Sequence, residues 1–132
     1  MIYCEKFGYQ PTVKTLDDFD EVSEGEMYEN TLVAFIHAEE VDELDIKSVE
    51  TKMVKNLKWA AKKNHTKSVL LHSFAHLAET KAAPVYTKEL FDRVEARMKN
   101  TDYTCAQTAF GYFMDLDIQA PGISQARIYK SF

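Results

Sequence analysis

Two histidines, His72 and His76, stand within the stretch 66–77, just after a run of apolar residues. Imidazole gains and loses a proton near neutral pH, so either ring is suited to acid–base chemistry or to binding a metal. Their spacing fits two metal ligands on a helix, but His72 ends a predicted strand instead of lying on a helical turn. No cysteine or carboxylate cluster supplies a third ligand, so we expect no metal site and no cofactor.

His76 is the candidate for proton transfer, because it follows Phe74-Ala75 at the tip of the predicted strand. A structural histidine held by hydrogen bonds is the alternative. For His72 we expect either a structural role or simple exposure at the end of the strand. His37 occupies a similar position after an earlier strand and is a weaker candidate. The run Phe110-Gly111-Tyr112-Phe113 is either ordinary strand sequence, which composition alone favours, or a platform that approaches a ligand at its glycine.

Two apolar runs, Leu32–Ile36 and Val69–Leu71, predict strands that are buried on both faces. Between them, residues 46–63 carry apolar side chains at spacings of three and four, which predicts an amphipathic helix. Two parallel strands joined by a helix form a right-handed unit whose site lies at the carboxyl ends of the strands. The sequence therefore predicts that His37-Ala38 lies beside residues 73–76.

The remaining segments are expected to complete a single domain, residues 1–132. A second helix is predicted from Pro84 to about Lys99, with the proline in its first turn. Pro11 and the acidic stretch 14–25 are expected to separate the first strand from the second. Further strands are predicted at residues 2–9, 103–109, 110–118 and 126–129. This order predicts an α/β fold with a mixed β-sheet and two main helices.

Composition predicts a soluble globular protein, since 45% of the residues are hydrophobic and 28% are charged. No apolar run could span a membrane and no signal sequence is visible, so we expect a cytoplasmic protein whose Cys4 and Cys105 are free thiols. The net charge of −5 argues against broad nucleic-acid binding, but not against handling the tip of an RNA. The predicted helix 46–63 has a basic face, for which solubility is the expected role and nucleic-acid binding the alternative.

Three motifs stand in order along the chain: residues 32–36 followed by the acidic residues 39–43, then Ser73–Leu77, then Ala109–Phe113. The first resembles the second strand and its connection in the archaeal threonyl-tRNA synthetase editing domain. The second resembles the Pro-Phe-Ala-His-Leu loop of that family, and the third resembles its Pro-Phe-Gly-Tyr-Tyr-Lys strand. The resemblance covers nearly the whole chain and is weakest over residues 10–30 and 119–132.

This resemblance implies a fold like that of the D-aminoacyl-tRNA deacylases, which are usually homodimers, and hydrolysis of serine mischarged on threonine tRNA. In this family a water attacks the ester with help from the terminal ribose 2′-hydroxyl. Backbone groups near Ala38 and Phe74-Ala75 would hold the aminoacyl part, and His76 matches the histidine that places the RNA end and the water. The other substrate contacts that the resemblance implies are His37, Gly111, Tyr112, Phe113 and Met114.

The chain also departs from the family pattern. Met114 stands where the family has lysine, Phe113 where it has its second tyrosine, and Ser73 where it has proline. An acidic residue near the family's C-terminal end aligns loosely with Arg127. Methionine cannot stabilise a developing anion as an ammonium does, so a surviving reaction is expected to be weaker. His37 replaces a small residue, and it would either compensate or narrow the pocket for a different aminoacyl group.

Three functions therefore stay open from the sequence. The first is an aminoacyl-tRNA deacylase that removes serine, the second a non-catalytic editing-domain relative that serves as a binding or assembly module, and the third a D-aminoacyl-tRNA deacylase. The expected partners are the 3′ end of an aminoacyl-tRNA, a second copy of the chain, and a threonyl-tRNA synthetase that lacks its own editing domain. The sequence does not distinguish a free-standing homologue from an excised domain.

Overall fold

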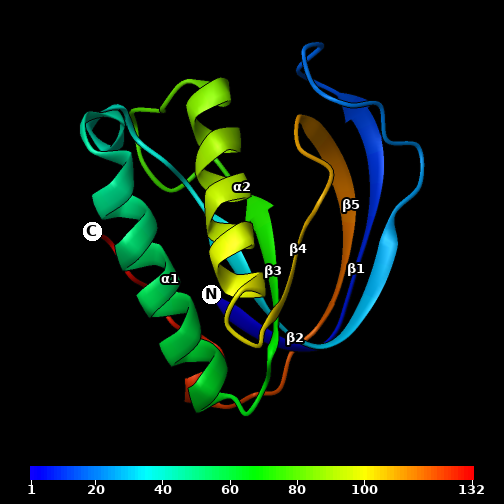
Figure 1. The fold of residues 1–132 in the computed structure, drawn as a ribbon. Coiled ribbons are helices and arrows are strands. Elements are labelled where there is room, and N and C mark those ends of the chain that lie inside the picture. The colour runs from blue at the N-terminus through cyan, green and yellow to red at the C-terminus, as the bar shows by residue number, and fades with distance from the viewer.

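The computed structural model describes all of residues 1–132 and contains a mixed five-stranded sheet with two long helices on one face (Figure 1). The strands are β1 (Ile2–Lys14), β2 (Glu26–Ile36), β3 (Ser68–Ser73), β4 (Thr104–Gln107) and β5 (Tyr112–Gln119). The helices are α1 (Ile46–Lys63) and α2 (Pro84–Lys99), and short 3₁₀ helices span Glu40–Leu44 and Ser124–Ala126. The predicted α/β class, with a mixed sheet and two main helices, is confirmed.

The sheet order is β4-β3-β2-β1-β5, and its centre is the predicted strand–helix–strand unit. β2 and β3 are parallel, in a register that runs from Leu32 opposite Val69 to Ile36 opposite Ser73. β4 is parallel to β3, whereas β1 is antiparallel to both β2 and β5. Because β2 and β3 run the same way, their carboxyl ends reach the same edge of the sheet, where the predicted site lies.

Both predicted helices are confirmed, and local sequence explains where they begin. The Asp45 side chain accepts a hydrogen bond from the Ser48 N–H at 3.1 Å, which caps the first turn of α1, and Pro84 occupies the first turn of α2. The two helices and the sheet share one apolar core. Its members from the helices are Met53, Val54, Leu57, Ala60, Ala61, Leu90, Phe91, Val94 and Met98, and from the sheet Leu32, Ala34, Val69, Leu71 and Cys105.

The opposite face of the sheet carries no helix (Figure 1). A smaller cluster of Cys4, Phe7, Val33 and Leu70 is nevertheless fully buried, with Phe7 edge-on to Phe35 and His72 on that face. Cys4 and Cys105 are buried free thiols, as predicted. Neither long helix combines the length and the apolar character that a membrane crossing requires.

Several predicted boundaries were wrong. β1 continues through Pro11 to Lys14, because beyond Tyr9 it pairs only with β5 and the register shifts next to the proline. β2 begins six residues earlier than predicted, at Glu26, where it completes a hairpin with β1. The strand predicted at 126–129 is reduced to one bridge between Ile2 and Arg127.

Candidate functional site

The carboxyl ends of β2 and β3 bring two predicted segments together, as the sequence indicated. The Phe74 N–H donates to the Ile36 carbonyl oxygen at 2.9 Å, which extends the pairing one residue past the end of β3. The Leu77 N–H then donates to Nδ1 of His37 at 2.9 Å. His37-Ala38 and the segment 73–77 therefore meet at one edge of the sheet, and the prediction that they lie side by side is confirmed.

His37 holds the loop after β3 in place through both of its ring nitrogens. Its Nε2 lies 2.7 Å from the Thr80 carbonyl oxygen, and its Nδ1 accepts from the Leu77 N–H. A carbonyl only accepts and an amide N–H only donates, so the ring must be neutral with its proton on Nε2. Because neither nitrogen is free, His37 acts as a clamp on the loop and offers no lone pair to a substrate.

Further contacts tie the same loop to the segment that follows β2. The Ala82 N–H donates to the Ala38 carbonyl oxygen at 2.9 Å, and the Thr80 hydroxyl donates to the Glu39 carboxylate at 2.9 Å. The Ala83 N–H donates to the Glu43 carboxylate at 3.1 Å, just before α2 begins. The loop after β3 is thus fixed along most of its length, which favours a defined geometry at its Phe74–His76 tip.

Replacing His37 by alanine is expected to loosen this loop without unfolding the domain. Two hydrogen bonds are lost, each contributing about 1 kcal/mol, so amide exchange at residues 77–82 should accelerate about tenfold or more. Hydrogen–deuterium exchange read by mass spectrometry measures this change. Thr80→Ala is the matched control, since it removes only the side-chain bond to Glu39 and should have the smaller effect. Equal exchange in the wild type and the His37 variant would show that His37 is not the clamp.

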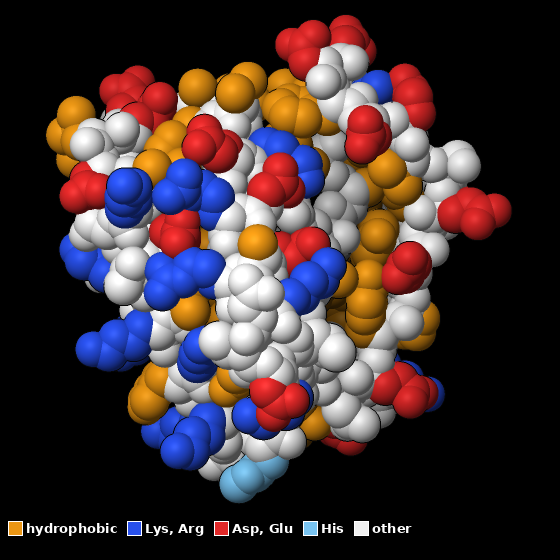
Figure 2. Space-filling model, in the orientation of Figure 1, with side chains coloured by type: hydrophobic (Ala, Val, Ile, Leu, Met, Phe, Trp, Pro, Cys, Tyr) orange, Lys and Arg blue, Asp and Glu red, His pale blue; other side chains and the backbone are white.

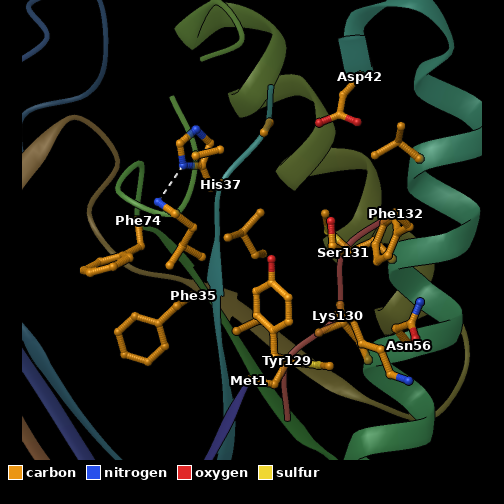
Figure 3. A pocket seen from close by; sticks show the side chains of 18 of the residues that line it. Met1, Phe35, His37, Asp42, Asn56, Phe74, Tyr129, Lys130, Ser131 and Phe132 are labelled. Carbon is orange, nitrogen blue, oxygen red and sulfur yellow. Dashed lines mark hydrogen bonds between the residues drawn. The ribbon is translucent and has the colours of Figure 1, made fainter. Parts of the chain in front are cut away.

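A pocket of about 490 Å³ opens beside this clamp, and 16 of its 22 lining residues are hydrophobic (Figure 3). One wall comes from the end of β2 with His37, Ala38 and Phe74, and the opposite wall comes from α1. The C-terminal segment 129–132 closes a third side, and Figure 3 shows the Tyr129 ring standing among the lining residues. A largely apolar hollow with a few polar groups is typical of a small-ligand site.

A row of aromatic rings leads from the sheet face that carries no helix to the loop tip. The centroids of Phe35 and His72 are 5.0 Å apart, those of Phe35 and Phe74 are 5.5 Å apart, and those of Phe74 and His76 are 5.0 Å apart. His72 is buried, and its Nδ1 lies 2.9 Å from the Thr108 hydroxyl. Burial lowers the pKa of His72 to about 4, so this histidine is a neutral structural residue, which is one of its two expected roles.

His76 differs from His72 in its exposure and in the hydrogen bonding of its ring. Its side chain is exposed, and no hydrogen bond is made by its ring. The ring packs edge-on against Phe74, which itself lines the pocket. His76 and Ala75 do not line the pocket but stand at its rim, on the loop that His37 holds. The described residues contain no group of three or more metal-binding side chains.

The second predicted group of site residues does not line this pocket in the single chain. Its members are Gly111, Tyr112, Phe113 and Met114. Gly111 has φ of +84° and precedes β5, and its carbonyl oxygen accepts from the Thr15 N–H at 2.7 Å. The glycine is needed for this turn, so the strand predicted at 110–118 starts two residues late. The Tyr112 hydroxyl accepts from the Val22 N–H at 3.0 Å and so ties β5 to the acidic loop.

The pocket also uses residues that no motif marked. Tyr129, Lys130, Ser131 and Phe132 reach it only because the C-terminal segment returns alongside Met1, whose N–H₃⁺ donates to the Ile128 carbonyl oxygen at 2.7 Å. Arg127 lies outside the pocket, and its guanidinium donates to the Pro121 carbonyl oxygen at 2.6 Å. β5 reaches the pocket at Ile118 alone. Local sequence carries no signal for such returns of the chain.

Comparison with known proteins identifies the family of this chain. A family model described as the archaea-specific editing domain of threonyl-tRNA synthetase matches residues 1–132. Similar proteins include the threonine–tRNA ligases of Pyrococcus horikoshii, 27% identical, and Pyrococcus furiosus, 26% identical, each over 134 residues. These alignments cover 99% of this chain but 21% of either relative, so the chain spans about a fifth of their length. With the whole chain matched, this protein belongs to the archaea-specific editing-domain family of threonyl-tRNA synthetase.

Proposed function

We propose that this chain hydrolyses the ester that links mischarged serine to threonine tRNA. The observation that carries the proposal is the junction of β2 and β3, where His37 clamps the Phe74–His76 loop beside a pocket of about 490 Å³. Family membership supports tRNA editing in general. A synthetase for threonine has difficulty excluding serine, because the two amino acids differ by one methyl group. A binding site discriminates such a difference only about 10–200-fold, so a second, hydrolytic site is useful.

In the proposed reaction, a water attacks the ester carbonyl and the terminal ribose 2′-hydroxyl assists. Ala38 and Phe74 line the pocket and are fixed by the loop contacts, so the backbone groups at Ala38 and Phe74-Ala75 that those contacts leave free would hold the aminoacyl part. His76, exposed at the rim, would place the RNA end and the water. His37 would contribute by holding the loop and by narrowing the pocket, and not as a base, because both of its ring nitrogens are occupied.

In this proposal Gly111 and the first residues of β5, Tyr112, Phe113 and Met114, supply further contacts to the RNA end. Support comes from the family match, which covers these residues, since within one chain only Ile118 of β5 lines the pocket. Met114 provides no charge and Phe113, which is 61% exposed, provides no hydroxyl. The reaction must therefore rely on the substrate's own 2′-hydroxyl and on fixed backbone groups, and we expect a slower hydrolysis than an ammonium at position 114 would support.

The first experiment is deacylation of Ser-tRNA(Thr) by the purified chain, with Thr-tRNA(Thr) and a D-aminoacyl-tRNA assayed beside it. The proposal expects serine to be released and threonine to be retained. Release of the D-amino acid alone would overturn the proposal in favour of chiral proofreading. No hydrolysis of any substrate, with tRNA still bound, would instead support a binding module.

The binding-module alternative rests on the apolar residues at positions 113 and 114, which remove the polar groups that catalysis would use. Under this alternative the chain would present tRNA to a threonyl-tRNA synthetase that lacks its own editing domain. Either function places the protein where tRNA is charged, in the cytoplasm. Co-purification of the synthetase with a chain that binds tRNA but does not hydrolyse it would favour this second function.

We also propose that the chain forms a homodimer through the sheet face that carries no helix. The register pairs Phe7 with Ile118 and Tyr9 with Leu116, so Leu116 and Ile118 lie on that face, and both are exposed. Light scattering should give twice the chain mass of 15.2 kDa. Leu116→Glu should yield a monomer, because a charge at a dry interface is costly. Val85→Glu, at an exposed valine on α2, should stay dimeric; a monomeric wild type would refute the dimer.

A further inference from the structure

The outward side of α1 carries a run of lysines around an exposed tryptophan. Residues three and four apart share one side of a helix, which places these side chains together. We define the α1 basic face as Lys52, Lys55, Trp59, Lys62 and Lys63. All five are exposed, and none of the four lysines forms an ion pair.

No acidic side chain of α1 neutralises this face. The only acid in the helix, Glu50, points the other way and bonds to Arg93 and Arg97 of α2. Burial would raise the pKa of Glu50, but the bonds and charges of the two arginines outweigh burial and hold its pKa below the usual value. The chain as a whole is acidic, at −5, yet Figure 2 shows blue side chains gathered along α1, with groups of red ones at the loop between β1 and β2 and at the upper end of α1.

The α1 basic face is continuous with the pocket. Lys63 and Lys130 lie over the Trp59 ring, with Nζ 4.9 Å and 5.0 Å from its centroid. Lys130 also lines the pocket, as does Asn56 on the adjacent side of α1 (Figure 3). A ligand that leaves the pocket past Lys130 would therefore meet Trp59 and then the lysines.

We propose that the α1 basic face binds the phosphate backbone of a tRNA whose 3′ end enters the pocket, with Trp59 stacking on a base. Unpaired lysines suit phosphates, and an exposed indole among them suits a nucleobase, which an acidic protein partner would not require. At ~1.5 Å per residue, the face from Lys52 to Lys63 extends about 16 Å, enough to follow several nucleotides. The identity of the RNA as a tRNA rests on the proposed function; the RNA contact itself does not.

The test compares Lys55→Gln/Lys62→Gln with Lys6→Gln/Lys99→Gln, exposed lysines outside this face. Both pairs change the net charge equally. Binding of uncharged, fluorescein-labelled tRNA(Thr) is followed by anisotropy across a range of salt concentrations. Each phosphate contact contributes ~0.7–0.9 to the slope of log affinity against log salt, so the first pair should bind about tenfold more weakly with a slope smaller by about 1.5. The control pair should bind as the wild type does.

Trp59 is the chain's single tryptophan, so its fluorescence reports directly on the face. Quenching by tRNA in the wild type and the control pair, reduced in the test pair, would support the proposal. The proposal would be overturned if both double variants lost the same affinity for tRNA. It would also be overturned if tRNA bound without a change in Trp59 fluorescence. A response to polyglutamate with none to tRNA would overturn it in favour of an acidic peptide. Because uncharged tRNA is used, these outcomes do not depend on whether Ser-tRNA(Thr) is hydrolysed.

Discussion

Under the proposed function, replacing His76 by alanine is expected to slow hydrolysis of Ser-tRNA(Thr) about a hundredfold, the lower end of what a positioned acid–base group contributes. The imidazole stands at the pocket rim, exposed and with no hydrogen bond to its ring, so it is available to the RNA end and the attacking water. Its ring packs edge-on against Phe74. The expected loss is therefore in rate and not in folding, and single-turnover deacylation kinetics measure it.

The control for this prediction is His65→Asn. His65 is also exposed, but it lies at the far end of α1, after the helix has ended. Its φ of +55° is tolerated by asparagine, so this variant should keep both its fold and its deacylation rate. Thermal unfolding of both variants should match the wild type. If the wild type is active and the His76→Ala variant hydrolyses Ser-tRNA(Thr) at the same rate, His76 has no part in the mechanism.

The elements that the sequence predicted well are those in which one periodic pattern decides the structure. α1 was placed at its observed bounds, because its apolar residues recur every three or four positions and Asp45 and Asn64 mark its ends. The parallel pairing of β2 and β3 followed from the same pattern, since a helix between two buried strands allows few arrangements. The meeting of His37 with the loop after β3 was therefore predictable.

What the sequence did not reveal depends on contacts between distant segments. The first half of β2, with Glu26, Tyr28 and Glu29, is too polar to suggest a strand, and only pairing with β1 makes it one. The occupied ring nitrogens of His37 depend on where Thr80 falls in a folded loop. The third side of the pocket comes from a C-terminal segment that has no motif and lies there because it returns beside Met1. Packing between segments that are far apart in the chain produces no periodic pattern in a single sequence.

The second large effect expected is on stability at acid pH, and it comes from His72. The folded protein keeps this buried ring neutral, with a pKa lowered to about 4, whereas an unfolded chain protonates it below about 6.5. Between these values the unfolded state binds the extra proton, so the free energy of unfolding falls as the pH drops from 6.5 to 4. The loss approaches about 3 kcal/mol when the full shift is expressed.

Urea unfolding at pH 7 and pH 4.5 measures this loss, and His72→Gln isolates it. Glutamine is polar but does not titrate, so the decrease in stability of this variant between the two pH values should be smaller by about 2 kcal/mol than that of the wild type. Carboxylates such as Glu50, whose pKa is held low, also lose stability in acid, but they do so equally in both proteins. His65→Asn should retain the full wild-type decrease, because that ring is exposed. The same decrease in all three proteins would show that His72 is protonated in the fold, and that the aromatic row does not keep it neutral.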